Sequence, residues 1–165
     1  MSRVLILGNS GSGKSTLAGR ICATEGLAHL DLDTLAWHPT SLPERQKLSV
    51  SARAIDDFMA SNHGWVIEGC YADLLELAVS QSTELIFMNL PMELCVENAR
   101  ARPWEPHKYA SKSAQDANLP MLIEWINQYA QRSDTFSFVS HHRLYEQYEG
   151  KKTMYTENCN SSHIS

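Results

Sequence analysis

The chain has 165 residues, of which 43% are hydrophobic and 20% charged, and its formal net charge at pH 7 is -5. This size and apolar content suit one well-buried domain over residues 1–165 and are small for two. The acidic balance, without a long run of Lys or Arg, argues against direct nucleic-acid binding. No apolar run approaches the ~20 residues that span a bilayer, and no signal peptide precedes the first strand, so a cytoplasmic protein is expected.

A glycine-rich loop directly follows the apolar run Val4-Leu5-Ile6-Leu7. It fits the pattern G-x-x-x-x-G-K-[ST], in which backbone N–H groups turn inward around a phosphate and the next helix adds the positive end of its dipole. Lys14 should reach the β- and γ-phosphates of a nucleotide, and Ser15 should ligate Mg²⁺. A Gly/Ser-rich turn without a ligand is the alternative. The predicted nucleotide-binding residues are Gly8, Asn9, Ser10, Gly11, Ser12, Gly13, Lys14, Ser15 and Thr16.

Beyond this loop, short apolar runs typical of strands alternate with segments whose apolar residues recur at helical spacing. Such alternation predicts an α/β fold with a parallel sheet covered by helices on both faces, and ligands at the carboxyl ends of the strands. The tail 157–165 is expected to fray. After the loop we expect, in chain order, helix 17–23, strand 29–33, helix 44–61, strand 65–69, helix 72–80, strand 84–90, a helix from Pro91 to Pro103, a helix from Pro120, helix 136–148 and strand 152–156.

Three carboxylates lie where predicted strands end. Asp31 and Asp33 close the second strand, where period-2 alternation would point both to the same side. Asp33 is the first choice for a carboxylate beside an acceptor hydroxyl, and Asp31 for holding a water of Mg²⁺. Alternatively, Asp33 caps a turn and Asp31 is a solvated edge residue. Glu68 ends an apolar run, where coordination of Mg²⁺ or its water would offset the cost of burying it; a structural salt bridge is the competing explanation.

Two segments are predicted to flank the site. Residues 34–62 would form an acceptor-side flap, in which Trp37, His38 and Arg45 are candidates for the acceptor pocket. Tyr71 could line the same pocket from the third strand. Each of these side chains could equally pack against the sheet edge.

Residues 103–118 are polar and show no clear periodicity, so a mobile lid is expected. Closure of this lid could bring guanidinium groups onto the γ-phosphate, and surface solvation is the alternative for any single arginine. Lys108 and Lys112 on the lid are open to the same two interpretations. The predicted arginines are Arg100 and Arg102 before the lid and Arg132 after it.

Phosphoryl transfer needs a phosphate cradle, a metal, a carboxylate near the acceptor and cations that close over the transferred group. The order of the phosphate loop, Asp31-Leu32-Asp33, Trp65-Val66-Ile67-Glu68-Gly69-Cys70-Tyr71 and an arginine-flanked lid resembles the small P-loop kinases, the superfamily of adenylate, shikimate and gluconate kinases. The resemblance covers about residues 3–156. It is greatest to adenylate-kinase-related proteins called DNA topology modulation proteins, which have a similar region between Asp33 and Trp37 and a W-x-x-E-G third strand.

The resemblance implies a five-stranded parallel sheet in the order 2-3-1-4-5, a lid, an acceptor-binding flap, and ATP with Mg²⁺. Asp33 resembles the acceptor-contacting aspartate of shikimate-type kinases, and Asp31 the metal-side one. Glu68-Gly69 resembles the Asp-Gly of adenylate kinases, which adds Gly69 to the acceptor side, and Arg132-Ser133-Asp134 is similar to an R-x-D step after the lid. Cys70-Tyr71-Ala72 departs from the Phe-Pro-Arg of adenylate kinases and removes an arginine from the acceptor site.

The leading hypothesis is an ATP-dependent kinase that phosphorylates a small metabolite or nucleotide, as a monomer or small homo-oligomer. One alternative is an ATPase or nucleotide switch that acts through a protein partner, as a DNA topology modulation-type regulator would. Another is a P-loop fold that binds nucleotide without turnover. The carboxylate Asp33 and the closing lid favour the kinase, because a simple switch needs neither.

Overall fold

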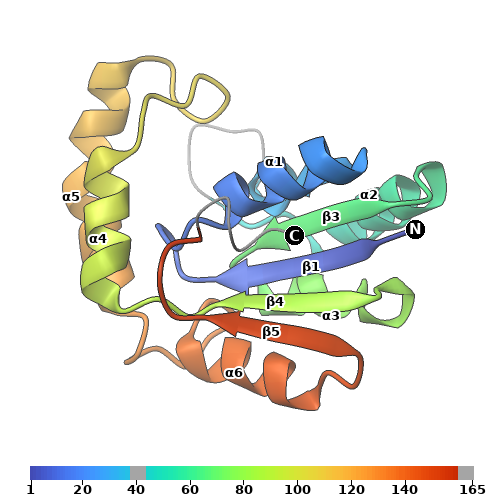
Figure 1. Ribbon diagram of the computed structural model, residues 1–165. Coiled ribbons are helices and arrows are strands. Elements are labelled where there is room, and N and C mark those ends of the chain that lie inside the picture. The colour runs from blue at the N-terminus through green and yellow to red at the C-terminus, as the bar shows by residue number, and fades with distance from the viewer. Residues whose placement is uncertain (38–43, 160–165) are drawn as a thin grey trace.

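The computed structural model describes residues 1–37 and 44–159 (Figure 1). Its five strands form one sheet, all neighbours parallel, in the order β2-β3-β1-β4-β5. This confirms the predicted α/β class and strand order. The strands are β1 (Arg3–Gly8), β2 (Ala28–Asp31), β3 (Trp65–Gly69), β4 (Glu84–Met88) and β5 (Lys151–Tyr155). The helices are α1 (Lys14–Glu25), α2 (Leu48–Ser61), α3 (Ala72–Glu76), α4 (Met92–Ala101), α5 (Lys112–Asn127) and α6 (Phe138–Gln147), with 3₁₀ helices η1 (Leu32–Thr34) and η2 (Val79–Gln81).

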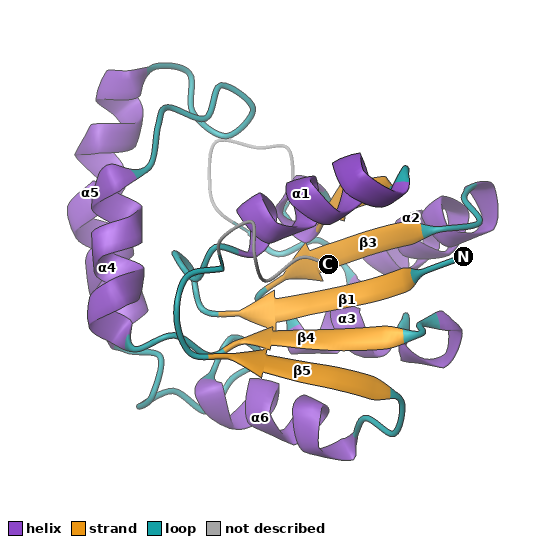
Figure 2. Ribbon diagram, in the orientation of Figure 1, coloured by secondary structure: helices purple, strands orange, loops and turns teal. Residues whose placement is uncertain are grey.

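The sheet separates two apolar cores, as alternation along β1 requires. Leu5 and Leu7 pack on the side of α2, α3 and α6, whereas Val4 and Ile6 pack on the side of α1, α4 and α5. Figure 2 shows helices on both sides of the strands. Because both faces are covered, β1 reads as a continuous apolar run. Among the described residues, no helix is long and apolar enough to cross a membrane.

The carboxyl ends of the strands meet at one edge of the sheet, toward which the arrowheads in Figure 1 point. The phosphate loop follows β1 there. In the register of the sheet, Glu68 on β3 lies opposite Ile6 of β1 on one side and opposite Asp31 of β2 on the other. The fold therefore brings the predicted phosphate loop and the predicted metal-side carboxylates to one edge.

The second strand is shorter than predicted, and Asp33 is not part of it. β2 ends at Asp31, whose Oδ1 accepts a hydrogen bond from the backbone N of Asp33 at 3.0 Å. This bond caps η1, which contains Asp33. The alternation argument for Asp31 and Asp33 was therefore wrong, although the two side chains remain neighbours.

The helix predicted to begin at Pro120 begins at Lys112, so residues 112–118 of the predicted lid are helical. Ser111 caps this helix by accepting a hydrogen bond from the backbone N of Ala114 at 3.1 Å. Two further boundaries differ from prediction. The helix expected from residue 44 starts at Leu48, and the segment 72–80 is divided between α3 and η2.

Candidate active site

The phosphate loop has the backbone geometry that its glycines predict. Gly11 and Gly13 have φ of 77° and 85°, in the left-handed region that other residues rarely adopt. A Cβ on Gly11 would also collide with the carbonyl of Cys95. Gly13 is the N-cap of α1, so the N-terminus of that helix opens onto the loop. The loop thus has the form of an anion cradle.

Two side chains of the loop hold its shape. The Lys14 ammonium donates to the Asn9 carbonyl at 2.8 Å and so spans the loop. The buried Asn9 side chain donates to the Ile126 carbonyl at 3.1 Å, which anchors the loop to α5. Lys14 is the loop cation that a bound phosphate would meet.

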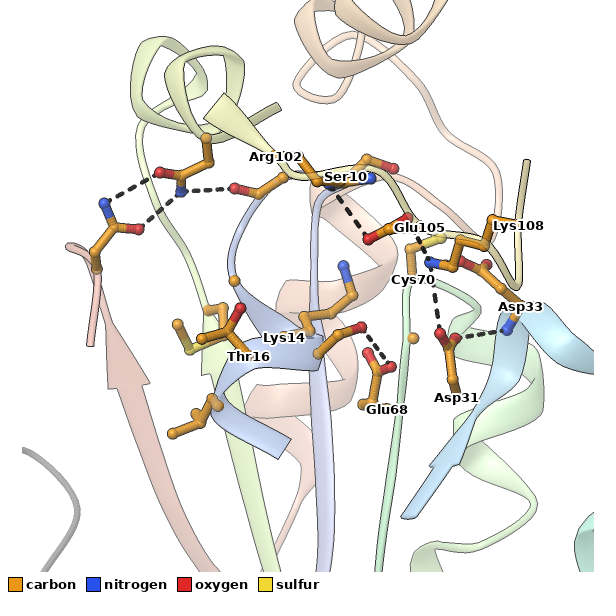
Figure 3. A pocket seen from close by; sticks show the side chains of 18 of the residues that line it. Ser10, Lys14, Thr16, Asp31, Asp33, Glu68, Cys70, Arg102, Glu105 and Lys108 are labelled. Carbon is orange, nitrogen blue, oxygen red and sulfur yellow. Dashed lines mark hydrogen bonds and ion pairs between the residues drawn. The ribbon is translucent and has the colours of Figure 1, made fainter. Parts of the chain in front are cut away.

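A cavity of about 500 Å³ extends from this loop to the ends of β2 and β3 and to the segment after α4 (Figure 3). Several residues predicted for the site do not line it: Gly8, Asn9, Ser12, Trp37, Arg45, Tyr71, Arg100 and Arg132. The predicted residues that do line it are Ser10, Gly11, Gly13, Lys14, Ser15, Thr16, Asp31, Asp33, Glu68, Gly69 and Arg102. His38 lies outside the described residues.

Glu68 is 1% exposed at the end of β3, directly beside the phosphate loop. Its Oε1 accepts a hydrogen bond from Ser15 Oγ at 2.8 Å and lies 3.5 Å from His29 Nε2. The hydrogen bond to Glu68 raises the pKa of His29 despite partial burial. Ser15, Glu68 and Asp31 therefore present hydroxyl and carboxylate oxygens, the donor set that suits Mg²⁺.

In the part of the chain that the structure describes, no group of three or more His, Cys, Asp and Glu is arranged to hold a metal. Mg²⁺ usually takes one or two carboxylates and completes its shell with phosphates and water. The residues present thus fit a metal that arrives with a nucleotide.

Asp33 is held by donors at both of its carboxylate oxygens. Tyr71 Oη donates to Oδ1, and Lys108 Nζ donates to Oδ2 at 2.9 Å. Burial raises the pKa of Asp33, but the Lys108 charge and the Tyr71 hydrogen bond lower it by more, so the pKa is below the ordinary value. Asp33 is therefore ionised at neutral pH and has lone pairs left for a hydroxyl proton.

The pKa of Asp31 is shifted in the opposite direction to that of Asp33. Burial and the charges of Glu68 and Asp33 raise the pKa of Asp31. Its Oδ2 lies 3.5 Å from Lys108 Nζ, which is also 3.9 Å from Glu105 Oε2. The Lys108 ammonium thus forms ion pairs with three carboxylates, those of Asp31, Asp33 and Glu105. Their negative charges raise the pKa of Lys108 despite its burial. We call this group, Asp31, Asp33, Glu105 and Lys108, the carboxylate end of the cavity (Figure 3).

The three predicted arginines lie in different surroundings. Arg102 lines the cavity, and its Nε lies 3.7 Å from Glu105 Oε1. Arg100 does not line this cavity but lines a smaller hollow of about 40 Å³ between α4 and α5. The guanidinium of Arg132 pairs with Asp134 at 2.7 Å and stacks on the Trp125 ring at 3.2 Å from its centroid. Arg102 is thus the predicted arginine nearest to the described cavity.

Three of the side chains predicted for the acceptor pocket, Trp37, Arg45 and Tyr71, form a cluster behind Asp33. Tyr71 is 2% exposed, and its hydroxyl accepts from Trp37 Nε1 at 2.8 Å while donating to Asp33. The Arg45 guanidinium lies over the Tyr71 ring at 5.1 Å and pairs with Asp73 at 3.2 Å. These residues support Asp33 from its buried side.

Several cavity residues were not predicted as site residues. The sequence allows both lid function and solvation for Lys108, because nothing in a polar, aperiodic segment distinguishes it from Lys112. Asn98 donates to the Gly11 carbonyl at 2.8 Å and to Asn158 Oδ1 at 2.7 Å, which links α4, the phosphate loop and the segment after β5. No motif signals that pair. The unpredicted lining residues with polar or thiol groups are Arg20, Cys70, Asn98, Glu105, Lys108, Tyr109, Asn158 and Cys159.

Comparison with known proteins identifies the fold of this chain but does not assign it to a family. No family model matches the chain. It is 24% identical over 131 residues to the uncharacterized protein YqaC of Bacillus subtilis (strain 168), an alignment that covers 75% of this chain and 70% of YqaC.

Solved structures with the same architecture include three small-molecule kinases. A gluconokinase from Sinorhizobium meliloti 1021 aligns with a TM-score of 0.53 at 16% identity, over 99% of this chain and 86% of the other. A sugar kinase from Janibacter sp. HTCC2649 gives 0.52 at 15%, over 99% and 90%. A shikimate kinase from Acinetobacter baumannii, in complex with shikimate, gives 0.54 at 12%, over 98% and 87%. The chain therefore has the fold of the small P-loop kinases.

Proposed function

We propose that this protein is a phosphotransferase that moves the γ-phosphoryl group of Mg·ATP to a hydroxyl group of a small-molecule acceptor. The observation that carries the proposal is that one cavity joins a complete phosphate loop to an ionised carboxylate, Asp33. A site that only senses a nucleotide needs no such carboxylate. Phosphoryl transfer depends chiefly on positioning and charge neutralisation, and this cavity offers both.

In the proposed reaction, the acceptor hydroxyl oxygen forms a bond to the γ-phosphorus while the bond to the β,γ-bridging oxygen breaks and ADP leaves. Asp33 accepts the hydroxyl proton. Lys14 and the loop N–H groups bind the β- and γ-phosphates. We propose that Arg102, rather than Arg100 and Arg132, neutralises the charge of the transferred group, because it is the one of these three arginines that lines the cavity.

The proposed metal is Mg²⁺, held by Ser15 and, directly or through water, by Glu68 and Asp31. When bound, it would supply charge neutralisation on the phosphate oxygens. The choice of ATP over GTP rests on resemblance to adenylate-kinase-like proteins, and so does the proposed kinship with DNA topology modulation proteins.

The test is ADP release from Mg·ATP by the purified chain, alone and with pools of sugars, sugar acids, nucleosides, nucleoside monophosphates and other hydroxylated metabolites. We expect at least one pool to raise the rate well above the acceptor-free rate. Lys14→Ala should abolish turnover, because it removes the cation that meets the phosphates. Asp33→Asn should keep nucleotide binding and lose transfer, measured by a nucleotide titration and the ADP assay on the same preparation.

Two results would contradict parts of this proposal. Transfer retained in Asp33→Asn would remove Asp33 from its acceptor role. Slow ADP release that no pool stimulates would favour an ATPase or switch working through a protein partner, the role that a DNA topology modulation-type regulator would have. Lys14→Ala serves as the control in both cases, since it separates turnover by this chain from a contaminating activity.

A further inference from the structure

The charge around Asp33 restricts the chemistry of the acceptor, an inference that rests on the proposed phosphotransferase function. An acceptor that carries a carboxylate or phosphate needs a cation to bind it. Lys14 lies in the phosphate loop, and Arg102 pairs with Glu105 on the roof of the cavity. Arg20 also lines the cavity, but it donates to the Cys159 carbonyl at 2.8 Å in the segment after β5, which lies at the opposite edge of the sheet from β2. The remaining cations to consider are Arg45, Arg132 and Lys108.

Arg45 and Arg132 each pair with a carboxylate outside the cavity lining. Arg45 pairs with Asp73 at 3.2 Å and lies over the rings of Tyr71 and Phe136. Arg132 pairs with Asp134 at 2.7 Å and stacks on Trp125. One nitrogen of each, Arg45 Nε and Arg132 Nη1, is buried without a hydrogen-bond partner among the described residues, but neither residue lines the cavity.

Lys108 is the cation nearest to Asp33, and three carboxylates already share it. Its ammonium lies 2.9 Å from Asp33, 3.5 Å from Asp31 and 3.9 Å from Glu105. An acceptor anion that took this ammonium would leave Asp31, Asp33 and Glu105 without their counter-charge in a partly buried site. Residues 38–43, His-Pro-Thr-Ser-Leu-Pro, contain no Lys or Arg that could compensate.

We infer that the acceptor is a polyhydroxylated compound without a carboxylate or phosphate: a neutral polyol, sugar or nucleoside, or an amino alcohol. Its hydroxyl groups can donate to the oxygens of the carboxylate end, and an ammonium group would add attraction there. Two like charges about 6 Å apart, at an effective dielectric constant of about 20, repel enough to weaken binding roughly 100-fold. The carboxylate end therefore selects against acidic analogues.

The experiment compares acceptors matched in shape and different in charge. Gluconate, sorbitol and glucamine share one carbon chain and end in a carboxylate, a hydroxymethyl and an aminomethyl group. AMP and adenosine, and shikimate and its methyl ester, form further pairs. The readout is kcat/KM for ADP release with each compound, followed by detection of the phosphorylated acceptor. We expect the uncharged or cationic member of the productive set to exceed its anionic counterpart at least tenfold.

A variant pair tests whether the carboxylate end causes this selection. Glu105→Gln removes one negative charge from it, so the ratio of kcat/KM between neutral and anionic members should fall severalfold. Glu76→Gln makes the same charge change on the exposed part of α3 and should leave the ratio unchanged.

The outcomes separate the inference from the function on which it rests. An anionic member used as well as its neutral counterpart, or better, overturns the inference and leaves the phosphotransferase proposal standing. If no compound in these sets or in the wider pools raises ADP release above the acceptor-free rate, the phosphotransferase proposal fails and the inference fails with it. If the ratio of kcat/KM between neutral and anionic members is unchanged in Glu105→Gln, the carboxylate end does not cause the selection.

Discussion

The Asp33 carboxylate has a donor at each oxygen, and the donors come from different parts of the chain. Tyr71 approaches from behind β3 and Lys108 from the segment after α4. Trp37 Nε1 donates to the Tyr71 hydroxyl at 2.8 Å, so that hydroxyl has its own proton left for Asp33. This chain of two hydrogen bonds stabilises the ionised form of Asp33.

Replacing Tyr71 by Phe should therefore raise the pKa of Asp33. A net hydrogen-bond contribution of about 1 kcal/mol corresponds to about 0.7 pH units. Since the proposed base must be ionised, the acidic limb of the pH profile of kcat/KM should move upward by about that amount. NMR titration of the Asp33 carboxyl carbon measures the same change without turnover.

Tyr148→Phe is the matched control for this prediction. Its hydroxyl is 2.8 Å from Ser82 Oγ, remote from the cavity lining, so the acidic limb should stay in place. An acidic limb and a carbon titration that do not move in Tyr71→Phe would mean that Tyr71 packs beside Asp33 without tuning it.

At the scale of single residues, the sequence predicted where the site carboxylates lie, but it did not predict the contacts of Tyr71 and Lys108. Asp31, Asp33 and Glu68 were identifiable because each follows an apolar run at the edge where ligands bind. Tyr71 was predicted to line the acceptor pocket, but it is buried, because local sequence does not say which side of a strand end is open. Lys108 meets Asp33 across 75 positions of sequence, and such a pairing has no local signal.

Among the connecting elements, residues 102–111 form a lid arm with its own internal hydrogen bonds. Trp104 Nε1 donates to the Tyr109 carbonyl at 3.0 Å. Gln115, in the first turn of α5, accepts from the Glu105 backbone N at 2.9 Å and donates to the Pro103 carbonyl at 3.1 Å. Lys108 then joins this arm to Asp31 and Asp33. Hydrogen bonds therefore connect the lid arm internally and to α5, and ion pairs of Lys108 attach it to the end of β2.

Lys108→Met should loosen the lid arm. Loss of charge-assisted bonds worth about 1 to 2 kcal/mol raises the population of the open arm severalfold, and cleavage of a transiently open segment follows that population. Chymotrypsin should therefore cut after Trp104 or Tyr109 severalfold faster in the variant, as measured by mass spectrometry of timed digests.

Lys112→Met is the control for the lid arm. Lys112 is 70% exposed and pairs with Asp116 one turn along α5, so its loss should leave the cleavage rate close to that of the parent protein. Equal rates in Lys108→Met and Lys112→Met would show that packing, and not the carboxylate end, holds the arm.

The start of α5 shows where local rules fail at the scale of an element. Proline suits the first turn of a helix, which is why Pro120 predicted a helix start. In the structure Pro120 is interior, where the lost hydrogen bond and ring clash cost about 3 kcal/mol. Ser111 caps the helix, and Leu119, Leu122 and Ile126 pack against the core of α1 and α4. That packing is tertiary, so it could not be weighed from the sequence of residues 103–118.

For the whole molecule, the topology was predictable because right-handed crossovers and alternating elements leave few arrangements of a parallel sheet. The side-chain contacts between the sheet and its helices were harder to predict from the sequence. His141 on α6 lies fully buried between α6, the turn after α5 and the end of β3. Its Nδ1 is 2.7 Å from Tyr129 Oη, and its Nε2 is 2.7 Å from the Cys70 carbonyl. The carbonyl can only accept, so Nε2 carries the proton and Nδ1 accepts from Tyr129.

This buried, neutral histidine should make folding stability depend on pH. Burial lowers the pKa of His141 to about 4, whereas an unfolded histidine titrates near 6.5. Between these values the unfolded chain binds a proton that the folded chain does not, so stability is lost as the pH falls from about 7 to 4. The difference corresponds to about 3 kcal/mol in the free energy of unfolding.

His141→Gln should remove that dependence, because the Gln amide can donate to the Cys70 carbonyl and does not titrate. Urea unfolding at pH 7, 5.5 and 4 measures the effect. The variant starts less stable at pH 7, since it loses the fit of the ring, but its free energy of unfolding should fall by about 3 kcal/mol less than that of the parent across this range. His142→Gln alters the exposed neighbour on the same helix and should follow the parent curve. Parallel curves for the parent and His141→Gln would mean that the ring is protonated in the folded chain, and the Tyr129 hydroxyl would then have to accept from Nδ1 instead of donating to it.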